Sequence, residues 1–93
     1  MINATTALQY GLVNYIVPQE ELMSKAIGIL DTINTKAPIA VSACISAANA
    51  AWDETINGYE IEIAQFGKCI GTNDMKEGTS AFLEKRKPVF KGH

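Results

Sequence analysis

The residues whose types and spacing could do chemistry lie near the end of the chain, after Asp74. Four of the eight Lys and Arg residues form its basic end: Lys85, Arg86, Lys87 and Lys91. Three consecutive cations, with the aromatic Phe82 three positions before them, can hold a ligand that carries phosphates and a flat ring. The same cations can form a solvated helix end, where the helix dipole favours positive charge. Composition alone favours the solvated helix end and leaves the anion site open.

Two carboxylates, Asp74 and Glu77, precede this basic end at the spacing of a capping box. In that motif the side chains accept hydrogen bonds from backbone N–H groups of the first helical turn. We therefore interpret Asp74 and Glu77 as a helix start, and Gly78 as a site for a bend or a close backbone approach. Acid–base catalysis needs a positioned pair of ionisable groups and donors for an oxyanion. No such pair is evident, so we expect no catalytic residue.

The remaining polar residues predict no metal site. Cys44 and Cys69 lie within apolar helical patterns, and we interpret both as small buried hydrophobic residues in a reducing cytosol. Two cysteines and the terminal His93 are too few ligands for a metal. The chain also contains no Gly-rich phosphate loop, H-E-x-x-H motif or nucleophile elbow.

The elements that must position these residues are expected to be helices. Apolar spacing, caps and breakers predict four to five of them, at Asn3–Tyr10, Gln19–Thr35, Pro38–Trp52, Ile56–Ile70 and from Asp74 onward. Leu12–Val17 reads as one short extended segment with no strand to pair with. The expected fold class is all-α, in a single domain over residues 1–93.

Two of these helices have more apolar surface than the chain can cover. Pro38–Trp52 is rich in alanine and almost uncharged, which is typical of a helix buried on most sides. Ile56–Ile70 carries a coiled-coil-like seam, spaced by three, four, three and four, formed by Ile56, Tyr59, Ile63, Phe66 and Ile70. With 93 residues available, we expect these faces to meet another domain or subunit.

Composition excludes several function classes. The net charge of −2 argues against a globally basic nucleic-acid binder. The uncharged run Ala37–Trp52 is shorter than the ~20 apolar residues that span a bilayer. The start of the chain has no basic targeting region. We therefore expect a cytoplasmic protein without nucleic-acid or membrane partners.

Two stretches carry patterns that occur together in one family. ATTALQYGLVNYIVPQEEL follows A-x-x-A-x-x-x-G-L-V-N-x-V-V-P at Ala4, Ala7, Gly11, Leu12, Val13, Asn14 and Pro18. TNDMKEGTSAFLEKRKPVFKGH matches D-x-x-E-G-x-x-A-F-x-E-K-R-x-P-x-F-x-G at Asp74, Glu77, Gly78, Ala81, Phe82, Glu84, Lys85, Arg86, Pro88, Phe90 and Gly92. On these residues the chain resembles the C-terminal part of the crotonase superfamily, in particular enoyl-CoA hydratases.

The resemblance implies a C-terminal helical domain without the family's catalytic spiral of ββα units. In the family, that larger part carries the oxyanion-hole N–H groups and the two glutamates that add water across the double bond. No glutamate of this chain sits in that context, so the chain alone is expected to show no hydratase activity. The parent reaction would be reversible hydration of a 2-enoyl-CoA thioester, in fatty-acid and acyl-CoA metabolism.

The resemblance also implies a binding role and a partner. The family's C-terminal helices assemble trimers, often paired into hexamers, and help close the acyl-CoA site. Phe82 and Lys85 match the Phe and Lys that approach the adenine and phosphate end of coenzyme A, so we expect these two to bind it. Arg86 and Lys87 would add electrostatic help. No metal or other cofactor is expected.

Two alternatives remain open. The parent enzyme could be another crotonase-superfamily acyl-CoA enzyme: an isomerase, a decarboxylase or a hydrolase. The chain could also be a helical self-association module with no enzymatic role.

Overall fold

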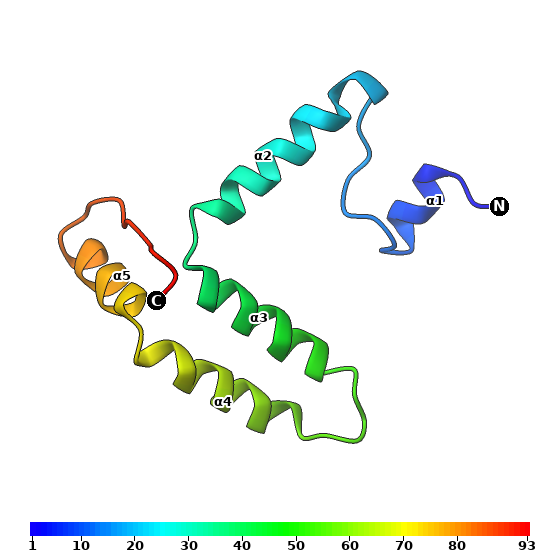
Figure 1. Ribbon diagram of the computed structural model, residues 1–93. Helices are drawn as coiled ribbons and strands as arrows, with labels where there is room; N and C mark the ends of the chain where they lie inside the picture. Colours follow the sequence, from blue (N-terminus) through cyan, green and yellow to red (C-terminus); the bar gives the residue numbers. More distant parts are fainter. The chain divides into compact units, whose positions relative to one another are not determined.

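The computed structural model describes all residues from 1 to 93 and shows an all-α chain without a β-strand (Figure 1). The predicted fold class is therefore confirmed. The chain forms two compact units, Met1–Asp31 and Thr32–His93. None of the helices combines the length and the apolar character that a membrane crossing requires.

The first unit opens with helix α1 (Ala4–Gln9), within the predicted range Asn3–Tyr10. The Asn3 side chain accepts a hydrogen bond from the Thr6 N–H at 2.8 Å. Gly11 ends the helix with a φ of 69°, which glycine adopts without steric cost. Leu12–Val17 follows without β-ladder hydrogen bonds, in keeping with a segment that has no pairing strand.

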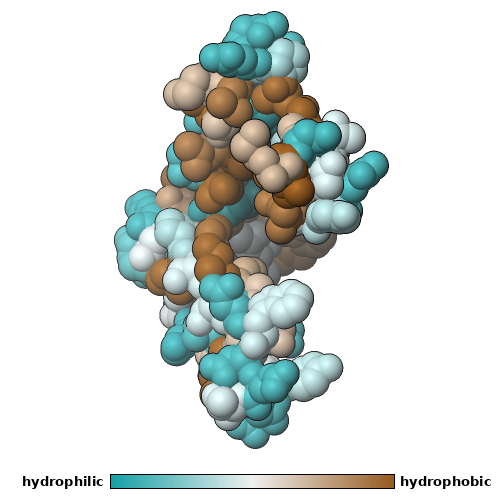
Figure 2. Space-filling model, turned by 90° about the vertical axis from the view of Figure 1, so that its right-hand side faces the viewer, coloured by the Kyte–Doolittle hydropathy of each residue, from teal (hydrophilic) through white to brown (hydrophobic).

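The predicted helix Gln19–Thr35 is divided into two elements. A 3₁₀ turn, η1 (Gln19–Glu21), comes first, and helix α2 (Leu22–Asn34) continues from it. The apolar stripe of α2 is exposed along its length, at Leu22, Met23, Ile27, Leu30 and Ile33. Figure 2 likewise shows apolar side chains at the surface. The amphipathic pattern thus forms a helix, although the chain does not cover its apolar face.

In the second unit, α3 (Pro38–Ala50) and α4 (Gly58–Ile70) form a helical hairpin (Figure 1). Pro38 starts α3 at N1, and the Asn57 side chain caps α4 by accepting from the Tyr59 N–H. On α3 the buried residues are small, Ala43 and Ala50, which leaves room for another helix backbone to approach closely. The α4 side of the contact is half-buried at Ile61, Gln65 and Cys69.

The predicted seam of α4 lies on its uncovered surface. Tyr59 is 79% exposed, Ile63 72% and Phe66 61%. Its periodicity marked an apolar face correctly, but this face is not the one that packs inside the chain. Cys44 is exposed and Cys69 is half-buried, so the prediction of two buried cysteines is wrong. The reason is the same: α3 and α4 cover only one face of each other.

Helix α5 (Asn73–Leu83) completes the second unit, and its start differs from the prediction. Thr72 is the N-cap residue, and its Oγ1 accepts from the Met75 N–H at 3.1 Å. Asp74 and Glu77 are therefore not a capping box. Because a threonine already caps the helix, both carboxylates are free to bind residues that follow α5.

Candidate functional site

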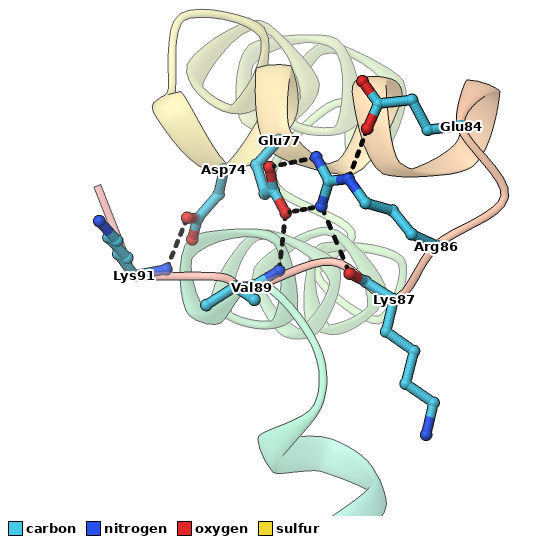
Figure 3. Close-up of polar contacts among 7 residues, drawn as sticks. All are labelled: Asp74, Glu77, Glu84, Arg86, Lys87, Val89 and Lys91. Atoms are coloured by element: carbon cyan, nitrogen blue, oxygen red, sulfur yellow. Dashed lines mark hydrogen bonds and ion pairs between the residues drawn. The ribbon is translucent and has the colours of Figure 1, made fainter.

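Asp74 holds the end of the chain against the first turn of α5 (Figure 3). Its side chain is buried, with 4% of the residue exposed. The two carboxylate oxygens accept from the backbone N–H groups of Lys91 and Gly92, at 2.7 and 2.8 Å. The Asp74 N–H donates to the carbonyl of His93 at 3.1 Å. These bonds satisfy a carboxylate that burial would otherwise destabilise.

Glu77 lies one turn further along α5 and holds the same segment. Its carboxylate pairs with both terminal nitrogens of Arg86, at 2.6 and 2.9 Å, and accepts from the Val89 N–H at 2.8 Å (Figure 3). The Arg86 hydrogen bonds, followed by the Val89 bond, lower the pKa of Glu77 to about 2. Glu77 is thus a carboxylate held in its charged form.

Residues 87–93, which we call the strap, run back along α5 between these anchors. Gly78 permits their approach, because a Cβ at this position would lie 3.3 Å from the Phe90 ring. Gly92 takes a φ of 80° and lies beside Pro38, the first residue of α3. The expected close approach at Gly78 is therefore present, with a ring in place of a backbone.

Phe82 and Lys85, the predicted coenzyme A pair, lie at the other end of α5. Phe82 is in the last turn and is 82% exposed. Lys85 is exposed and takes a φ of 55°, the left-handed conformation in which helices usually end with glycine. Hydrogen bonds from Arg86 N–H to the Ala81 carbonyl and from Lys85 N–H to the Phe82 carbonyl close this turn. The Lys85 ammonium makes no ion pair.

The run of three cations at 85–87 is divided by the structure. Besides its bidentate pair with Glu77, Arg86 donates from Nε to Glu84 and from Nη1 to the Lys87 carbonyl. Hydrogen bonds to Glu77 and Glu84 raise the Arg86 pKa further. The charge of Arg86 is thus already paired with two carboxylates, and its expected electrostatic help toward coenzyme A stays a prediction. Lys87 lines a separate hollow of about 500 Å³ with Lys36.

The anchoring role of Asp74 and Glu77 was missed by the sequence-based interpretation. A signal was present, because two carboxylates one turn apart precede a segment with four cations. The capping box explained the same spacing locally, and nothing in the spacing distinguishes the two. The structure brings together no group of three His, Cys, Asp or Glu residues that could hold a metal.

Comparison with known proteins supports the family resemblance that the sequence motifs suggested. The family model described as enoyl-CoA hydratase/isomerase matches residues 1–93. A crotonyl-CoA hydratase of Syntrophomonas wolfei is 43% identical over 91 residues, 97% of this chain and 35% of that protein. A methylmalonyl-CoA decarboxylase of Escherichia coli is 36% identical over 95 residues, 99% of this chain and 36% of that protein.

The fold has a counterpart in a crystal structure of an enoyl-CoA hydratase from Bacillus anthracis. That structure matches with a TM-score of 0.90 and 39% identity, over 99% of this chain and 36% of the other. The chain thus spans about a third of the length of the relatives it matches. Because the family model and these relatives align along nearly every residue, the chain belongs to the enoyl-CoA hydratase/isomerase family.

Proposed function

We propose that residues 1–93 form the C-terminal helical domain of an enoyl-CoA hydratase-like enzyme. In this proposal the domain supplies one wall of the coenzyme A site and a surface for self-association, and it supplies no catalytic residue. The parent reaction is reversible hydration of a 2-enoyl-CoA thioester. The observation that carries the proposal is the free pair Phe82 and Lys85 at the end of α5, within a motif of the family.

The relatives support a role in coenzyme A binding more strongly than they support any one reaction. A crotonyl-CoA hydratase and a methylmalonyl-CoA decarboxylase differ in the bond they make or break, yet both names contain a CoA thioester. The aligned region is similar in both, at 43% and 36% identity. Residues common to such enzymes are expected to serve what their substrates share, which is the coenzyme A part.

The chemistry of the pair fits that part of the substrate. An exposed aromatic ring offers a stacking surface for adenine, and an unpaired ammonium offers a charge for phosphates. Phe82 and Lys85 are one turn apart at the same helix end, so a single nucleotide-bearing ligand can reach both. Other walls of the site would come from outside the pair, since both side chains are open to solvent.

Self-association is proposed for the exposed seam of α4. Ile63 and Phe66 expose most of their surface beside Tyr59 and Ile70. Large contiguous apolar surfaces on a soluble domain mark interaction sites, because their burial is favourable by roughly 25 cal/mol per Å². A second copy of the chain is the proposed partner.

The first test is a titration of coenzyme A into the ¹⁵N-labelled chain, followed by amide chemical shifts. We expect shifts centred on Phe82 and Lys85 at millimolar ligand. Lys85→Ala should weaken the response more than Lys87→Ala does, because Lys87 lies in a separate hollow and would contribute only its charge. Wild-type spectra without shifts would contradict the coenzyme A role and favour a self-association module.

The second test concerns catalysis. We expect no hydration of crotonyl-CoA by the 93-residue chain, measured as loss of the conjugated absorbance. Turnover above the buffer rate would contradict the assignment of catalysis to residues outside this chain.

A further inference from the structure

Lys85 has a backbone conformation that its side chain disfavours. A φ of 55° brings Cβ close to the following carbonyl group, which costs roughly 1–2 kcal/mol in a residue such as lysine. Lys85 is the only non-glycine residue of the chain with a positive φ. Strained conformations of this kind persist where surrounding contacts hold them, and they concentrate at functional sites.

The contacts that can hold this turn converge on the next residue, Arg86. Its guanidinium makes a bidentate pair with Glu77, at 2.6 and 2.9 Å. Glu77 lies in the middle of α5, so the pair draws the chain back along the helix immediately after Lys85. The Val89 N–H donates to the same carboxylate at 2.8 Å, which extends the attachment into the strap.

Figure 3 shows Arg86 between the carboxylates of Glu77 and Glu84. The two carboxylates differ in how they contact Arg86 and in how exposed they are. Glu84 contacts Arg86 through one oxygen and its side chain is 59% exposed, whereas Glu77 uses both oxygens and is 26% exposed. Glu77 is therefore the main anchor, and Glu84 is a natural control.

We propose that Glu77 is a positioning residue for ligand binding, which acts through Arg86 to keep Lys85 in its left-handed turn. The turn fixes where the Lys85 side chain leaves the backbone relative to Phe82, and so where a phosphate of coenzyme A can meet the ammonium. This inference rests on the proposed coenzyme A role of the pair. Its competing explanation is that the two backbone hydrogen bonds to Ala81 and Phe82 hold the turn without Glu77.

Glu77→Gln in the full 93-residue chain separates these explanations. The glutamine keeps the size of the side chain and an acceptor for the Val89 N–H, but it loses the charge that Arg86 pairs with. A positive φ brings HN and Hα of the same residue close together and gives a strong NOE cross-peak between them. We expect this cross-peak of Lys85 to weaken. If the turn survives in about one fifth of the molecules, the apparent Kd for coenzyme A rises about fivefold.

Three further variants keep the test decisive. Arg86→Lys retains the positive charge and the free Glu77 carboxylate for Val89, but removes the bidentate geometry, and it should weaken the same cross-peak. Glu84→Gln should leave both the cross-peak and the Kd unchanged. In the double variant Glu77→Gln with Lys85→Gly, glycine takes the turn without strain, so the Arg86 and Val89 amide shifts should return toward their wild-type positions.

The outcomes are distinguishable from those of the proposed function. An unchanged Lys85 cross-peak in both Glu77→Gln and Arg86→Lys overturns the inference, because the turn then holds without the pair. An equal loss in Glu84→Gln also overturns it. A wild-type chain that shows no coenzyme A shifts overturns the proposed function, while the cross-peaks still decide whether Glu77 sets the turn.

Discussion

At the scale of single residues, Lys85 adopts a backbone conformation that its side chain disfavours, and the free-energy cost of this can be measured. Glycine relieves the strain of a left-handed turn, although it also makes the unfolded chain more flexible. We expect Lys85→Gly to raise the free energy of unfolding by about 0.5–1 kcal/mol, the difference between these two effects. Urea unfolding followed by circular dichroism measures it. Lys87→Gly is the control and should not stabilise, because Lys87 lacks a positive φ.

The same substitution should weaken coenzyme A binding, since it removes the unpaired ammonium. Stability and ligand affinity would then change in opposite directions at one position. Such a trade-off is typical of a residue retained for binding. A Lys85→Gly chain that loses stability would contradict the strained turn.

Glu77 provides a pH-dependent prediction at the same scale. Its pKa in the folded chain is about 2, below the ordinary glutamate value of about 4.3. The stabilisation from its charged form is therefore fully present above about pH 4.3 and is lost as the pH falls toward 2. We expect the Arg86 and Val89 amide shifts of the folded chain to change with a midpoint near pH 2, the folded-state pKa of Glu77. The Glu77→Gln chain should lack this transition, and its persistence there would assign the transition to another group.

At the scale of elements, the strap and α5 depend on a contact at Gly78. Two glycines inside helices form a matched pair: Gly67 of α4 has open space around its missing Cβ, whereas Gly78 faces the Phe90 ring at 3.3 Å. Alanine in a helix interior gains roughly 1 kcal/mol over glycine. We expect Gly67→Ala to show this gain and Gly78→Ala to show less, because the ring must move. Urea midpoints compare the two, and equal gains would mean that Phe90 does not rest on α5.

Also at this scale, the helices were predictable and the role of two carboxylates was not. The N-cap at Asn3, the stop at Gly11 and the start at Pro38 follow from local hydrogen bonds and fixed φ angles. The spacing of Asp74 and Glu77 fits a local capping box as well as it fits an anchoring role. Their partners, Lys91 and Val89, lie more than a helix length away in sequence, so spacing alone could not select them.

At the scale of the whole molecule, the chain has little interior of its own. Its buried apolar residues are three alanines, Ala43, Ala50 and Ala81, while every large apolar residue of the α4 seam is exposed. A chain with so small a core gains stability by burying apolar surface against a partner. This is the physical basis for the proposed self-association.

We therefore expect Ile63→Glu, in the centre of the seam, to weaken self-association at least about tenfold, since a buried charge without a partner costs more than about 1.4 kcal/mol. Light scattering against concentration measures the change. Lys68→Gln is the matched control, because it changes the net charge by the same amount on the same helix. If the wild-type chain is monomeric, or if both variants weaken assembly equally, the seam is not the interface.

The sequence by itself determined the all-α class, most helix boundaries and the family, because these depend on periodicity, caps and motif residues that are local. Tertiary structure alone decided three things: which face of α4 packs against α3, where Asp74 and Glu77 bind, and that Arg86 is paired while Lys85 is free. Each depends on groups distant in sequence. An apolar stripe does not specify what will cover it, and a carboxylate accepts any donor that the fold brings within hydrogen-bonding distance.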